Sequence, residues 1–113
     1  MNNLKTIRNF IGLSEKDLAK FLAINTRTYR AYENNKILIP KENIQILSKM
    51  YGITPNDLLN CDNILQLPQI RVLLNLTKEQ IIFKLTKNLF GQEITVTRFA
   101  VNALKHELLK TNK

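Results

Sequence analysis

The sequence predicts an all-α protein, and three kinds of observation support this. Apolar residues recur three and four positions apart, which is the spacing of one helical face. Ser14 with Asp17, and Thr77 with Gln80, have the spacing of a capping box at a helix start. Gly12 follows an apolar stripe, where a left-handed residue can end a helix. With 113 residues there is room for one domain, or for a small domain and an appendage.

Residues 1–60 carry signals for five short helices. Ser14, Asn25 and Thr54 can each cap the segment that follows, which marks the starts of the second, third and fifth helices. The three residues 23–25 are long enough only for a sharp reversal. We therefore expect helices over about residues 3–11, after Ser14, over residues 26–34, from Pro40 to Gly52, and after Pro55.

Charge and composition narrow the function. The net charge of +8 favours an anionic partner such as nucleic acid, and residues 1–60 and 61–113 each contribute +4. No apolar run approaches the ~20 residues of a membrane span, and the start of the chain is unlike a signal peptide. Cys61, the single cysteine, fits a reducing cytoplasm, and with the single His106 it cannot build a zinc site. We expect a cytoplasmic protein with no metal and no cofactor.

Several motifs lie in one register in the N-terminal half: Gly12-Leu13-Ser14, Asp17-Leu18-Ala19, Leu22, Ile24-Asn25, Thr28, Tyr32-Glu33, Pro40 and Ile53-Thr54-Pro55-Asn56-Asp57-Leu58. In this register the chain resembles the lambda-repressor/Cro-like, or XRE-type, helix-turn-helix domain over about residues 4–59. The resemblance implies a five-helix DNA-binding domain in residues 1–60, followed by a small helical C-terminal extension in residues 61–113. The third helix would then enter the major groove of double-stranded DNA.

The resemblance also places side chains. Thr26, Arg27, Arg30 and Ala31 would lie on the groove-facing surface. Arg27 is the first candidate for base readout, because a guanidinium can donate two parallel hydrogen bonds to guanine O6 and N7. Arg30 could do the same or bind a phosphate. Expected phosphate contacts, which set the register of the protein on DNA without reading sequence, are Ser14, Lys16, Asn25, Thr28, Asn34 and Lys36.

Other positions are structural or depart from the family pattern. The pattern implies an ion pair between Arg8 and Glu33, and the two tyrosines of the third helix are expected in the core with hydroxyls at its edge. Glu15 stands where the family usually has a glutamine that grips a phosphate. A carboxylate would repel that phosphate, so Glu15 either turns away or marks altered docking. Asn35 replaces the family's glycine after the third helix, which its tolerance of positive φ permits.

Residues 61–113 are too apolar for a disordered tail. The stretch around Pro68 predicts a short helix, then a helix or a strand across residues 70–74. A helix should follow Thr77 and end at Gly91, with a last helix beyond it. Two or three such helices hardly close a core alone, so they should pack on the N-terminal domain, on a second copy or on another protein. We favour self-association, with these dimerisation candidates: Ile81, Leu85, Leu89, Phe99, Leu104 and Leu108.

The leading hypothesis is a sequence-specific bacterial transcriptional regulator, a repressor that binds an inverted-repeat operator as a homodimer. One alternative is a phage- or plasmid-type interaction protein, an antitoxin or anti-CRISPR-like inhibitor, whose C-terminal half binds a protein target. Another is a second DNA-binding unit that presents Arg98, Asn102 and Lys105. We expect no enzyme, because His106 and Cys61 lack partners in register and the chain has no phosphate-binding glycine loop.

Overall fold

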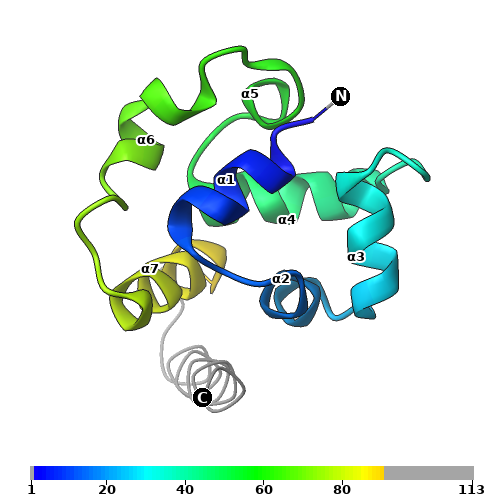
Figure 1. Cartoon of the computed structure of the whole chain (residues 1–113), viewed down its shortest axis with the longest axis horizontal. Coiled ribbons are helices and arrows are strands. Elements are labelled where there is room, and N and C mark those ends of the chain that lie inside the picture. Colours follow the sequence, from blue (N-terminus) through cyan, green and yellow to red (C-terminus); the bar gives the residue numbers. More distant parts are fainter. Residues whose placement is uncertain (1, 91–113) are drawn as a thin grey trace.

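The structure, a computed structural model, describes residues 2–90, and every regular element within this range is helical (Figure 1). It therefore confirms the predicted all-α class. The elements, in chain order, are α1 Leu4–Ile11, α2 Glu15–Leu22, α3 Thr26–Glu33, α4 Lys41–Tyr51, α5 Pro55–Asn60, the 3-10 turn η1 Ile64–Gln66, α6 Pro68–Arg71 and α7 Lys78–Phe90.

Local signals explain most of these boundaries. Gly12 and Gly52 both adopt left-handed backbone, with φ of 76° and 73°, and they end α1 and α4. Thr54 caps α5 by accepting a hydrogen bond from the N–H of Asp57. Pro40 lies one residue before α4 instead of in its first turn. The stretch left open between helix and strand, residues 70–74, contains no strand: residues 70 and 71 end the short helix α6, and residues 72–74 form turns. Pro68 occupies the first position of α6, where its missing N–H leaves no donor unpaired.

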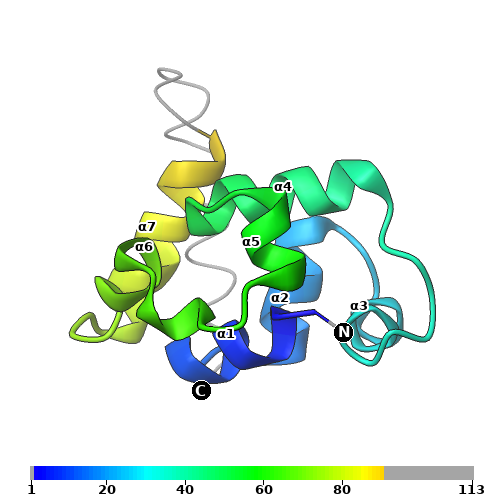
Figure 2. The ribbon, with the colours of Figure 1, turned by 90° about the horizontal axis from the view of Figure 1, so that it is seen from above.

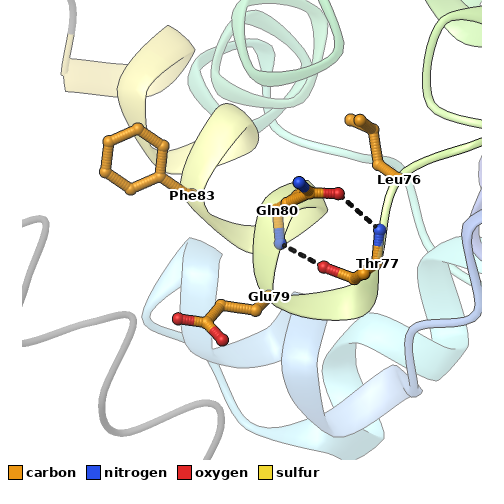
Figure 3. A pocket seen from close by; sticks show the side chains of 5 residues that line it. All are labelled: Leu76, Thr77, Glu79, Gln80 and Phe83. Atoms are coloured by element: carbon orange, nitrogen blue, oxygen red, sulfur yellow. Dashed lines mark hydrogen bonds between the residues drawn. The ribbon is translucent and has the colours of Figure 1, made fainter.

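The helix α7 begins with the predicted second capping box (Figure 3). The Thr77 hydroxyl accepts from the N–H of Gln80 at 3.2 Å, and the Gln80 side chain accepts from the N–H of Thr77 at 2.9 Å. Next to this box, Nζ of Lys78 lies 3.7 Å from the buried carboxylate of Asp17 in α2. The start of α7 is therefore connected to the start of α2.

A single hydrophobic core runs through the described residues and does not stop at residue 60. Leu47 and Met50 of α4, Ile70 of α6 and Ile82 of α7 are all fully buried in it. Among the described elements, α4 and α7 have the most extensive contact with each other. Residues 61–90 therefore pack on the N-terminal helices, which is one of the three arrangements that the sequence left open.

This packing contradicts the prediction that Ile81 and Leu85 are dimerisation residues. Ile81 and Leu85 are only 4% and 1% exposed, because the apolar stripe of α7 faces the core of its own chain. They have no surface to offer to a second copy. Leu89 is half-buried and packs against the same core. Three further candidates and the suggested second DNA-binding unit lie outside the described residues: Phe99, Leu104, Leu108, Arg98, Asn102 and Lys105.

The two ends of the described part are formed by different helices. In both views α3 lies at one end, while α6 and α7 lie at the other (Figures 1 and 2). The helices α1 and α4 lie between them, and α2 packs against α3. The end that carries α3 is thus separated from the C-terminal helices.

Candidate DNA-binding surface

Local contacts set the start of α2 and the turn of residues 23–25 that joins α2 to α3. Ser14 and Asp17 form a complete capping box at the start of α2, as the sequence predicted. At its end Ala23 adopts left-handed backbone with φ of 56°, which costs an L-residue about 1–2 kcal/mol. Asn25 then caps α3, because its Oδ1 accepts from the N–H of Thr28 at 2.8 Å. Sequence reasoning found the reversal but missed the positive φ, since alanine gives no signal for it.

The inner face of α3 is aromatic. The rings of Tyr29 and Tyr32 are both buried and meet edge to face at 6.5 Å. The expectation that both hydroxyls reach the edge of the core is wrong. The Tyr32 hydroxyl accepts from Nδ2 of buried Asn43 at 3.0 Å, and the Tyr29 hydroxyl is buried with no hydrogen bond to any residue in the range 2–90. Burial first, then the charges of Tyr51 and Glu33, raise the pKa of Tyr29.

The other side of α3 carries the four predicted base contacts. Arg27 and Arg30 are exposed, and Thr26 and Ala31 are half-buried at the helix surface. The two tyrosines bury one side of α3 in the core. These four side chains therefore lie on the solvent-facing side of a helix at one end of the molecule. The arrangement offers two guanidinium groups to an anionic partner.

The predicted phosphate contacts lie at the start of α2 and at both ends of α3. Ser14, Lys16, Asn25, Asn34 and Lys36 are exposed, and Thr28 is half-buried. At the C-terminal end of α3, Asn35 adopts a φ of 56°, so it takes the backbone conformation for which the family uses glycine. This turn lets the N–H of Lys36 donate to the carbonyl oxygen of Ala31 at 2.9 Å, which fixes the backbone of Lys36 beside the helix.

The C-terminal end of α3 is also held by a residue that sequence reasoning missed. Nδ2 of Asn2 donates to the carbonyl oxygen of Tyr32 at 2.9 Å and to Oδ1 of Asn35 at 3.1 Å. The chain start therefore gives the carbonyl oxygen of Tyr32 a second donor, besides the N–H of Asn35 at 3.3 Å. An asparagine that precedes the first helix belongs to no periodicity or spacing that could have indicated this contact.

Arg8 and Glu33 form the ion pair that the family pattern implies. Nε and Nη2 of Arg8 donate to the two carboxylate oxygens at 2.6 and 3.1 Å, and Nη1 donates to the carbonyl oxygen of Leu13 at 3.0 Å. The side chains are only 11% and 1% exposed. The pKa of Arg8 is raised, chiefly by its hydrogen bond to Glu33. This bidentate pair joins α1 to the end of α3.

Glu15 has a partner that the sequence did not indicate. Its Oε1 accepts from Nε of Arg30 at 3.1 Å, so the first residue of α2 contacts the exposed side of α3. The carboxylate of Glu15 therefore turns toward a cation of α3, a contact that neither sequence-based reading of this residue included. The contact joins residues 15 positions apart, which is too far for a helical spacing rule to find.

Other kinds of site find no support in the described part. Within residues 2–90 no three metal-binding side chains come together. None of the helices in that range has the length and apolar character needed to cross a bilayer.

Comparison with known families adds one finding. A family model described as helix-turn-helix matches residues 4–58, which run from the start of α1 to the buried Leu58 of α5. Neither the curated proteins nor the solved structures contain a match to the chain.

Proposed function

Residues 4–58 of this chain form a helix-turn-helix domain of the XRE, lambda-repressor-like type, and we propose that this DNA-binding regulator is a repressor that binds an inverted-repeat operator as a homodimer. Each copy inserts α3 into the major groove. The dimer blocks polymerase by occupying the promoter. Two-fold symmetry places the two α3 helices about one DNA turn, ~34 Å, apart.

The observation that carries this proposal is the two-sided character of α3. One side is anchored by the buried Tyr29 and Tyr32, and the other presents Arg27 and Arg30 to solvent. A helix of this kind fits a major groove, which admits an α-helix and displays paired acceptors on guanine. The net charge of +8 adds attraction to the phosphate backbone, which supplies most of the affinity that is independent of sequence.

The test begins with the full-length chain and a random pool of DNA duplexes at one stated salt concentration. Selected sequences should contain an inverted repeat whose half-sites are spaced by about one helical turn. Arg27→Ala should then relax the preference at one base position in each half-site, with a loss of about 1–3 kcal/mol in discrimination. Lys36→Ala should weaken binding to all sequences alike and reduce the slope of log K against log salt by about one.

Matched controls come from the opposite end of the molecule. Arg71→Ala in α6 and Lys84→Ala in α7 remove the same charges far from α3, and both side chains are exposed. They should leave base preference unchanged. A wild-type chain that selects no sequence would refute the proposal. Equal effects of Arg27→Ala and Arg71→Ala would show that net charge, and not α3, determines binding.

A further inference from the structure

The pair formed by Glu15 and Arg30 bridges the two helices of the helix-turn-helix. Their side chains are 26% and 56% exposed, so the contact lies at the surface that would face DNA. Arg27 differs, because no ion pair in the described part of the chain involves it. Within residues 2–90, one exposed arginine of α3 therefore has an ion-pair partner and the other has none.

The geometry of the contact leaves the DNA-binding edge of Arg30 available. Glu15 accepts from Nε, at 3.1 Å. A guanidinium carries five N–H donors in a rigid plane, so a bond at Nε orients the whole plane while the edge formed by the two terminal nitrogens points onward. That edge matches the O6 and N7 acceptors of guanine. A carboxylate at this position therefore directs the arginine without occupying the atoms that read a base.

The charge of Glu15 also has a cost. It stands at the first position of α2, where the positive end of the helix dipole accommodates a carboxylate but where a DNA phosphate would be repelled. Pairing with Arg30 neutralises both groups. The pair thus lowers attraction to DNA of any sequence, and it fixes the direction of one side chain. The ion pair therefore reduces the affinity for DNA of any sequence and favours discrimination between bases.

We propose that Glu15 is a specificity-determining residue: by binding Nε of Arg30 it holds that guanidinium end-on toward one guanine in each operator half-site. This inference rests on the proposed function, because it requires α3 to enter the major groove. Arg30 makes the base contact, and Glu15 is the positioning residue.

The experiment is a double-mutant cycle with the full-length chain on its selected operator. The position read by Arg30 is first found as the one whose preference Arg30→Ala relaxes. Glu15→Gln removes the charge, and Glu15→Asp keeps the charge but shortens the reach. Both should reduce the preference for guanine at that position by about two- to fivefold, as expected for an exposed ion pair, and both should have no effect on preference in the Arg30→Ala background.

The affinity for non-operator DNA distinguishes the effect of the Glu15 charge from the effect of Glu15 on the orientation of Arg30. Glu15→Gln should strengthen binding to non-operator DNA, while Glu15→Asp should not. Glu42→Gln removes a carboxylate from the first turn of α4, where Glu42 is exposed, and should leave the guanine preference intact. Equal thermal midpoints would show that the variants fold alike.

Two results would overturn the inference while leaving the proposed function standing. One is a wild-type preference that survives both Glu15 substitutions. The other is a loss of preference that is the same with and without Arg30, which would mean that Glu15 acts only through its charge. Failure of the wild-type chain to select any sequence would instead refute the proposed function together with this inference.

Discussion

Removing the guanidinium of Arg8 should destabilise the fold severely. Glu33 is 1% exposed and receives both of its short hydrogen bonds from Arg8, at 2.6 and 3.1 Å. In Arg8→Ala the carboxylate stays buried without its cation, and breaking a buried pair in this way costs about 3–5 kcal/mol. The carbonyl oxygen of Leu13 also loses its partner at 3.0 Å. Small domains are stable by about 5–15 kcal/mol in total, so a large share of the stability is lost.

Urea unfolding followed by circular dichroism measures this loss directly. At about 4–8 °C for each kcal/mol, the midpoint of thermal unfolding should fall by roughly 12–40 °C. Arg71→Ala is the matched control, since Arg71 is exposed on α6, and it should change stability by no more than about 0.5 kcal/mol.

A double variant distinguishes the cost of an orphaned charge from the value of the pair. Replacing both Arg8 and Glu33 by methionine removes the charges together, and buried ion pairs exchanged for apolar groups are often neutral in stability. The double variant should therefore be more stable than Arg8→Ala alone. A loss below about 1 kcal/mol in Arg8→Ala, or a double variant as unstable as the single one, would refute the reasoning.

Two further predictions concern the core. The folded state raises the pKa of Tyr29 and Tyr51 above the unfolded value near 10, chiefly through burial, so above pH ~10 the unfolded state loses protons first. Stability should be full below that pH and fall above it by about 1.4 kcal/mol per unit for each tyrosine, and Tyr29→Phe should halve the slope of an alkaline denaturation series. Leu85→Ala should lower the free energy of unfolding, measured in urea, by about 2–5 kcal/mol. Leu38→Ser, at a side chain that is 94% exposed, should change it by less than about 0.5 kcal/mol. Similar losses in both variants would contradict the assignment of α7 to the core.

The helix boundaries were predictable because their causes are local. A capping box acts over three residues, as at Ser14 with Asp17 and at Thr77 with Gln80, and both boxes are present in the structure. The contacts of Glu15 with Arg30 and of Asn2 with Tyr32 were not predictable. Their partners lie 15 and 30 positions apart, so only the packing of α2 and the chain start against α3 brings them together.

The dimerisation prediction shows a different limit. Helical periodicity correctly selected Ile81 and Leu85 as the apolar side of α7, but periodicity does not say what covers an apolar side. Their burial in the core of the same chain answers this for residues within α7. Any contact between copies, or with another protein, must therefore use surfaces other than these two side chains.

The two ion pairs of α3 differ in burial, so they should respond differently to salt. An eight-residue helix is too short to be stable alone, so its position depends on its neighbours. The buried bond between Arg8 and Glu33 holds the C-terminal end and is little screened, whereas the exposed bond between Arg30 and Glu15 is weakened by ions. Added salt should therefore act on the contacts of α3 with DNA and on the orientation of Arg30, while α3 keeps its place on α1.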